Sequence, residues 1–256
     1  MKLRVLGCGT STGVPRVGND WGACDPVEPR NRRSRVSIMV ENAAGSRLLV
    51  DTSTDLRMQL LSNEIDRIDA VFWTHEHADH AHGIDDLRVL RYGRGGPIPG
   101  YAHSEIARIL RARFGYVFAG QYGYPTLVEL DTLDRLRMCA GFGVRHCQMP
   151  HGPGGESTAY RFDCDGKSIG YATDFSAITR DMVALFDGVD ILVSDCLRRD
   201  PHPTHAHLAM ALELIEACRA GTGVLSHLDK SMDYATLSAE VPPHVLVAYD
   251  GMELVA

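Results

Sequence analysis

Short apolar runs and amphipathic segments alternate along the chain and predict most of its regular structure. Runs rich in β-branched and aromatic residues, often bounded by glycine or aspartate, predict strands at residues 2–7, 35–41, 46–51, 69–74, 168–174, 190–195, 222–227 and 244–250. Apolar residues spaced three and four apart predict helices at 54–65, 104–118 and 207–220, the last with Thr204 as a candidate cap. Early strands follow one another closely and later ones alternate with helices. The pattern therefore predicts an α/β or α+β protein with helix-covered sheets.

No internal repeat, low-complexity tract or linker divides the chain. We therefore expect residues 1–256 to form one domain, which at this length can bury a substantial core. The start "MKLRVLGCGT" is typical of a strand that enters a loop rather than of a signal peptide, and no membrane span is evident. Seven cysteines without a C-x-x-C pair fit reduced thiols. A cytoplasmic protein is the resulting expectation.

The formal net charge of -7 has the wrong sign for a protein that holds nucleic acid chiefly through phosphates. One basic patch, "NRRSR" at 31–35, could be a solvated edge or a phosphate contact. An aromatic stretch from Tyr116 to Tyr124 could stack on a base or sugar, or could belong to the core or a packed lid. Its members are Tyr116, Phe118, Tyr122 and Tyr124.

Polar residues stand where the predicted strands end. These residues are Asp51, Thr74 with His75, Asp174, Asp195 and His227. Open sheets present the side chains at such ends to a shared crevice. We therefore expect polar groups from distant parts of the sequence to converge.

The densest cluster is "HEHADH" at 75–80, directly after a strand. His75, His77, Asp79 and His80 supply three imidazoles and a carboxylate, which are ligands that zinc and manganese accept. Four donors in six residues exceed one ion's share, so the spacing indicates two neighbouring divalent ions. Glu76 and His82 are expected to face solvent.

The stretch "THEHADH" resembles the H-x-H-x-D-H signature of the metallo-β-lactamase superfamily, which implies a four-layer αβ/βα sandwich with a two-metal site at one edge. The later histidine, aspartate and histidine of that family match His151, Asp174 and His227. The resemblance implies that one ion is bound by His75, His77 and His151, the other by Asp79, His80 and His227, and both by Asp174.

Asp51 matches the superfamily aspartate that hydrogen-bonds near the metal ligands. Such an outer carboxylate fixes the tautomer and direction of a metal-bound imidazole. A strand-end turn is the alternative role.

Two further stretches, "LGCGTSTGVPRVGNDWGACDP" and "VAYDGMELVA", resemble the phosphodiesterase branch of the superfamily, in particular the PhnP-type phosphoribosyl cyclic phosphodiesterases. The resemblance implies a metal-dependent hydrolase that cleaves a small cyclic or nucleotide-like phosphodiester. In the glycine-rich loop, backbone N–H groups and the hydroxyls of Thr10, Ser11 and Thr12 could bind phosphate oxygens. Asp79 would orient the attacking nucleophile.

The stretch "SDCLRRDPHPTHAHLAMAL" resembles the region where this branch keeps an acid near a histidine outside the metal ligands. That match gives His205 as the group that protonates the leaving oxygen and Asp195 as its partner. Spacing alone leaves His202 and His207 open.

PhnP-type proteins also carry a cysteine cluster and a second late histidine as a structural zinc site. Here only Cys24 remains, and Lys230 stands where that histidine would fall. We therefore expect no structural zinc.

Two other functions fit the same resemblance. A tRNase Z-like endoribonuclease would need a grip on tRNA, which the acidic charge disfavours. A PqqB-like binding or carrier protein would not need the complete set of metal ligands. We expect a small phosphodiester as partner, no membrane and no nucleic acid, and leave a homodimer open.

Overall fold

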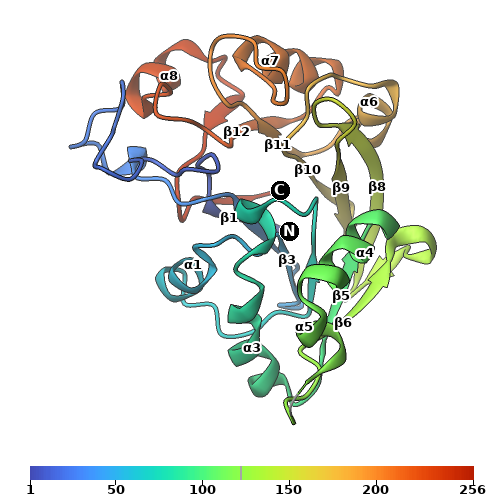
Figure 1. The fold of residues 1–256 in the computed structure, drawn as a ribbon. Coiled ribbons are helices and arrows are strands. Elements are labelled where there is room, and N and C mark those ends of the chain that lie inside the picture. Colours follow the sequence, from blue (N-terminus) through green and yellow to red (C-terminus); the bar gives the residue numbers. More distant parts are fainter. Residues whose placement is uncertain (122) are drawn as a thin grey trace.

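Two seven-stranded sheets face each other in the computed structural model, which describes residues 1–121 and 123–256 (Figure 1). Tyr122, part of the aromatic stretch, lies outside the described residues. The first sheet consists of β1 (Lys2–Gly7), β2 (Ser37–Glu41), β3 (Arg47–Val50), β4 (Ala70–Phe72), β5 (Ile98–Ala102), β6 (Val128–Thr132) and β14 (Glu253–Val255). The second sheet consists of β7 (Met138–Cys139), β8 (Phe142–Pro150), β9 (Glu156–Cys164), β10 (Lys167–Ala172), β11 (Ile191–Asp195), β12 (Thr222–Ser226) and β13 (Val245–Val247).

Helices and short 3-10 turns connect these strands. The helices are α1 (Leu56–Ser62), α2 (Ala78–Ala81), α3 (Leu87–Arg94), α4 (Ser104–Arg113), α5 (Gly115–Ala119), α6 (Arg180–Phe186), α7 (Leu208–Ala217) and α8 (Tyr234–Glu240). The 3-10 turns are η1 (Pro29–Asn31), η2 (Ile84–Asp86) and η3 (Leu133–Arg135). Among the described helices, none combines the length and the apolar character needed to cross a bilayer.

The two sheets repeat one plan. Their strand orders are β14-β1-β2-β3-β4-β5-β6 and β13-β12-β11-β10-β9-β8-β7. In the first sheet the strands from β3 to β6 are parallel and the others antiparallel. In the second sheet the strands from β10 to β13 are parallel. The parallel halves carry the crossover helices.

Side chains alternate between two cores. On β3, Leu48 and Val50 point into the core between the sheets, while Leu49 points into the core under α1, α3 and α4. A third core lies under α6, α7 and α8, which cover the outer face of the second sheet in Figure 1. The order helix, sheet, sheet, helix confirms the predicted αβ/βα sandwich and explains why the parallel strands are apolar on both faces.

All eight strands predicted from the apolar runs are present, whereas two helix predictions need correction. The predicted helix at 104–118 is interrupted at Phe114, whose φ of -123° and ψ of 37° leave the helical region before Gly115. Thr204 does not cap α7, which begins after His207. The Thr204 carbonyl instead accepts a hydrogen bond from His151, and His207 forms an isolated bridge with Arg198.

The parallel strands end at one edge of the sandwich. Asp51 follows β3, Asp174 follows β10 and His227 follows β12. The φ angles of these three residues are 64°, 60° and 59°, so each has a left-handed backbone that turns the chain sharply at the end of its strand. The turn directs their side chains toward the space between the two sheet edges.

Candidate metal centre and active site

The histidine-rich segment occupies the turn from β4 into the four-residue helix α2. His77 precedes the helix in an extended conformation, and Asp79 and His80 lie within it. His75, Asp79 and His80 are buried, while His77 is exposed at the rim. The change from strand to helix within five residues lets successive side chains converge from different directions.

One group of imidazoles consists of His75, His77 and His151. The Nε2 atom of His75 lies 3.0 Å from Nδ1 of His77, and Nε2 of His151 lies 3.3 Å from the same atom. His151 comes from the loop after β8, and its other nitrogen, Nδ1, lies 2.7 Å from the Thr204 carbonyl oxygen. That contact fixes the ring so that Nε2 faces the other two histidines.

A second group consists of Asp79, His80 and His227. Asp79 Oδ2 lies 3.5 Å from His80 Nε2 and 3.6 Å from His227 Nε2. Asp174 lies between the two groups, with carboxylate oxygens 3.2 Å from His80 Nε2 and 3.8 Å from His151 Nε2. The structure thus brings all seven predicted ligands together, although they come from four separate segments.

The chemistry of these donors fits divalent metal ions. Nε2 of His80 and both ring nitrogens of His227 are buried without a hydrogen-bond partner, since the 3.2 Å approach of His80 to Asp174 lacks hydrogen-bond geometry. Buried polar atoms are seldom left unpaired, so Nε2 of His80 and Nε2 of His227, which both approach Asp79 and Asp174, fit ligands of a cation. The donor atoms within each group lie within 4.8 Å of one another. Imidazole and carboxylate donors of this kind are the usual ligands of zinc and related ions.

Charges within the cluster set the protonation of its carboxylates. Burial alone would raise the pKa of Asp174, but His227 and His80 outweigh it and hold the pKa well below its usual range. The pKa of Asp79 is likewise lowered by His80 and His227 despite burial. Burial alone would lower the pKa of His227, whereas Asp174 and Asp79 raise it to about 9. Both carboxylates are therefore anionic at neutral pH, the form that binds cations.

Asp51 contacts the cluster from behind. Its carboxylate accepts hydrogen bonds from the backbone N–H and the hydroxyl of Thr74, both at 2.8 Å, and lies 2.8 Å from His80 Nδ1. Burial raises its pKa, and His80 opposes that rise. A carboxylate on Nδ1 leaves His80 Nε2 free to face Asp79 and Asp174.

His205 lies beside the cluster and contacts Asp195. Its Nδ1 is 3.1 Å from Asp195 Oδ2 and 3.5 Å from Asp174 Oδ1, and its ring stacks on His227 with centroids 4.7 Å apart. The same Asp195 oxygen accepts from the backbone N–H of Ala206 at 3.2 Å, which orients the carboxylate.

The other two candidate histidines are placed differently. His202 packs against His205 at 5.2 Å, with its Nδ1 accepting from the backbone N–H of Thr204. His207 is the residue before α7. Within the described residues, the groups of potential metal donors include His205 but neither of these two.

The glycine-rich loop runs next to His227. The backbone N–H of Thr10 donates to the Leu228 carbonyl at 3.2 Å, and Gly13 N–H donates to the Thr10 carbonyl at 2.8 Å. Because these amides already have partners, any phosphate contact at this loop falls to other groups. Ser11 and Thr12 have exposed side chains, and the Thr12 hydroxyl accepts from Arg16.

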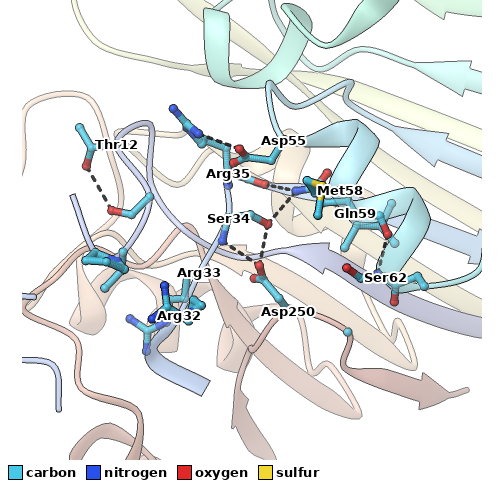
Figure 2. Close-up of a pocket in the computed structure, with 16 residues that line it drawn as sticks. Thr12, Arg32, Arg33, Ser34, Arg35, Asp55, Met58, Gln59, Ser62 and Asp250 are labelled. Atoms are coloured by element: carbon cyan, nitrogen blue, oxygen red, sulfur yellow. Dashed lines mark hydrogen bonds and ion pairs between the residues drawn. The ribbon is translucent and has the colours of Figure 1, made fainter. Parts of the chain in front are cut away.

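The basic patch at 31–35 lines a separate cavity of about 470 Å³ on the flank of the molecule (Figure 2). Arg35 forms an ion pair with Asp55 at 2.8 Å, and Arg32 lies over the ring of Trp21 at 5.0 Å. Arg33 is buried and donates to the Met232 carbonyl at 2.7 Å. Contacts within the protein thus engage all three guanidinium groups, which favours a structural role for the patch.

The aromatic stretch also packs within the protein. Tyr116 donates to Asp85 at 2.6 Å, and Phe118 packs edge-on against Trp73 with ring centroids 6.3 Å apart. Tyr124 is exposed and has Arg88 over its ring. As far as the structure describes the chain, none of the three lines the cavity beside the histidines.

A cavity of about 650 Å³ opens beside His75, His77 and His151, and no pattern in the sequence indicates it. Glu76 lines it and is half-buried, so the expectation that this residue faces solvent was wrong, whereas His82 is exposed as expected. Glu156, an exposed residue at the start of β9, also lines it. An isolated glutamate carries no pattern that would reveal such a wall from sequence.

Residues 46–228 match the family described as the beta-lactamase superfamily domain, and the chain belongs to this superfamily. Its fold and its histidine–aspartate centre define a metal-dependent hydrolase. A solved structure described as a new diphosphatase from the PhnP family is 35% identical, with a TM-score of 0.88 over 99% of this chain and 96% of that one. This similarity supports the phosphodiesterase branch.

More distant solved structures share the fold. The short form of human tRNase Z is 21% identical, with a TM-score of 0.70 over 100% of this chain and 99% of that one. Zinc-bound PqqB from Methylobacterium extorquens is also 21% identical, with a TM-score of 0.77 over the whole of both chains.

A curated relative from Porphyromonas gingivalis named octanoyltransferase is 33% identical over 263 residues. The match spans 100% of this chain but 51% of that relative, so the chain spans about half the relative's length. The name describes that longer protein as a whole.

Proposed function

We propose that this protein hydrolyses a small cyclic or nucleotide-like phosphodiester with two divalent ions, zinc or manganese, bound by the seven clustered ligands. The observation that carries the proposal is His205, an imidazole beside the metal centre that is held by Asp195 at 3.1 Å. Ester hydrolysis at phosphorus must protonate a departing alkoxide, and a positioned histidine suits this task. The similarity to a PhnP-family diphosphatase supports phosphorus chemistry at such a site.

Each residue has a distinct part in the proposed reaction. When bound, the two ions lower the pKa of the attacking water and neutralise charge on the phosphoryl oxygens. Asp79 orients the nucleophile. Asp195 accepts from His205 Nδ1–H, so that Nε2 is directed away from Asp195 and can give its proton to the leaving oxygen. Asp51 holds His80 in the corresponding way.

The other functions compatible with this fold have less support. The flank cavity near the glycine-rich loop has its arginines engaged in internal contacts, which disfavours this cavity as a grip for tRNA. A carrier protein has no need for a histidine–aspartate pair beside a complete set of metal ligands.

The proposal is tested by loading the protein with zinc or manganese and assaying bis(p-nitrophenyl) phosphate, ribose cyclic phosphates, cyclic nucleotides and a precursor tRNA. An octanoyl thioester belongs in the panel because of the curated relative's name. We expect turnover of small phosphodiesters. Cleavage of precursor tRNA alone, acyl transfer alone, or tight ligand binding without turnover of any ester would each contradict the proposal.

A further inference from the structure

The cavity beside the metal centre is large enough for a nucleoside- or sugar-sized group. Its volume is about 650 Å³, and His75, His77 and His151 form its inner end. The loop before α4, α4 itself, the end of β8 and the loop that follows supply the rest of the wall. A substrate whose phosphate sits at the histidines would therefore extend one ester group into this cavity.

The wall of the cavity is acidic. Glu76 and Glu156 line it, and neither carboxylate forms an ion pair with the residues that the structure describes. A third carboxylate, Glu105, is neutralised by Arg108 at 2.6 Å. Arg113 reaches the backbone carbonyl of Glu76 rather than its carboxylate. Within the described chain, the lining contains no lysine or arginine.

The other polar side chains of the lining, away from the metal centre, are His103, Gln148 and Thr179, beside glycines of the loop after β8. The side-chain amide of Gln148 contacts the Thr158 hydroxyl, with its nitrogen at 3.2 Å and its oxygen at 3.5 Å. Ile106, Ile109 and Met149 supply an apolar surface. Sites that bind phosphate groups commonly use arginine and lysine, and the described lining contains neither.

We propose that this cavity selects the substrate by charge: it receives an ester group that carries hydroxyl or ammonium donors and no negative charge. This inference rests on the proposed phosphodiester hydrolysis. A second phosphate or a carboxylate in the cavity would face the unpaired Glu76 and Glu156. Repulsion between like charges at such a wall lowers the kcat/KM of an anionic substrate by about tenfold or more.

The test uses three p-nitrophenyl phosphodiesters that differ only in the second alcohol: choline, propanol and 3-hydroxypropanoate. The reacting phosphate and the leaving group are then identical. We expect kcat/KM to follow the order choline, propanol, 3-hydroxypropanoate, with about tenfold between the first and the last at low salt. The difference should lie mainly in KM, because the wall contacts a group remote from the reacting bond.

Glu76→Gln combined with Glu156→Gln should reduce the choline-to-hydroxypropanoate ratio to below about threefold, chiefly through faster cleavage of the anionic ester. Turnover of the propyl ester should stay nearly constant, which shows that the metal centre is intact. Glu129→Gln is the matched control, because Glu129 is an exposed residue on β6 that does not line the cavity. It removes one carboxylate that lies away from the cavity and should leave the ratio unchanged.

A binding measurement gives an independent readout. Calorimetric titration should show tighter binding of phosphocholine than of 3-phosphooxypropanoate to the wild type, and a smaller preference in the double variant. Equal kcat/KM for all three esters, or a ratio that the double variant leaves unchanged, would overturn the charge selection while the proposed hydrolysis stands. Absence of turnover of every ester would instead overturn the proposed function, and this inference with it.

Discussion

The side chains of the metal centre depend on one another for their charge. Asp174 and Asp79 remain anionic although they are buried, because His80 and His227 face them. Nε2 of His80 and both ring nitrogens of His227 nevertheless have no hydrogen-bond partner. An uncompensated set of buried donors is costly to the fold. A bound cation relieves that cost, which couples metal binding to stability.

Removal of one ligand should therefore release metal. We expect His75→Ala or Asp174→Ala to lower the bound metal by about one ion per chain or more and to reduce activity by at least about 100-fold. Elemental analysis of the purified variants, together with turnover of a phosphodiester, measures both effects. His82→Ala is the control, because this exposed histidine belongs to the same segment but contacts none of the ligands. Full metal content and full turnover in Asp174→Ala would refute the ligand assignment.

Replacement of His205 should slow the cleavage only of esters that have a poor leaving group. His205→Ala should retain its metal and lose about 10² to 10⁴ in kcat on an alkyl ester, the usual contribution of a positioned acid. A nitrophenolate leaves without protonation, so the same variant should lose much less on a nitrophenyl ester. His202→Ala and His207→Ala are matched variants that should lose little on either. Equal losses of His205→Ala on both esters would assign this histidine to phosphate binding instead.

Among the elements, the best predicted were the strands that end at the active site. β10, β11 and β12 are parallel, buried on both faces and bounded by Gly or Asp, so their sequences are strongly apolar. Strands β5 to β9 and β14 were missed because they are short, contain Gly and Pro, alternate or carry charges, as in "IPGYA", "VELDT" and "ESTAYRFDC". The break at Phe114 was missed because the apolar spacing continues through it.

A buried arginine joins two segments where the resemblance to PhnP-type proteins would place a zinc site. Arg33 donates to the carbonyls of Asp229 and Met232 and lies 3.9 Å from Cys24 Sγ, while Lys230 pairs with Asp20. Its guanidinium thus links the segment before β2 to the loop after β12. The Asp229 carbonyl also accepts from the backbone N–H of Met232, so it is the Met232 carbonyl that depends on this cationic side chain for a partner.

Replacement of this arginine should weaken the fold. We expect Arg33→Met to lower the free energy of unfolding by about 1 to 3 kcal/mol, because it leaves the buried Met232 carbonyl unsatisfied. Arg32→Met removes an exposed neighbour that stacks on Trp21 and should change it by about 0.5 kcal/mol or less. Urea titration of both variants measures the difference, and equal effects would show that Arg33 has no linking role.

The absence of a structural zinc remains a prediction with its own test. Cys24→Ser should leave the number of bound metal ions unchanged, because the described thiol contacts Arg33 rather than a cluster of metal-binding groups. Elemental analysis beside the wild type decides this. Loss of one ion per chain in Cys24→Ser would mean that the cysteine is a ligand.

At the scale of the whole molecule, the C-terminal segment packs against the N-terminal segment. β14 pairs with β1, and Asp250 accepts hydrogen bonds from the backbone N–H groups of Cys8 and Ser34. Figure 2 shows Asp250 beside Ser34. Burial raises the pKa of Asp250 to about 6, although the hydrogen bonds from Ser34 and Cys8 oppose that rise.

This raised pKa predicts a pH dependence of stability. Between about pH 4 and pH 6 the folded protein holds a proton on Asp250 that the unfolded chain has lost, so this residue's contribution to stability falls as pH rises. Asp250→Asn removes the titration. Relative to the variant, the wild type should lose up to about 3 kcal/mol of unfolding free energy across this range. A difference between the two proteins that stays constant from pH 4 to pH 6.5 would contradict the assignment.

The sequence revealed the candidate site more completely than its surroundings. His75 to His80 form a dense local pattern, and His151, Asp174 and His227 follow in a recognisable order. The cavity wall has no such pattern, because Glu76 and Glu156 come together only through the packing of β9 beside the turn after β4. Contacts that depend on the meeting of two surfaces leave no periodic trace in either segment.

The left-handed backbone at Asp51, Asp174 and His227 has a consequence for the history of such chains. A side chain in this conformation costs on the order of 1 kcal/mol more than glycine. In a duplicated gene whose product no longer needed to bind metal, glycine or asparagine at these three positions would therefore spread without penalty. Glycine or asparagine at the ends of β3, β10 and β12 is thus the earliest sequence sign that we expect in a protein of this fold that has lost its hydrolase activity.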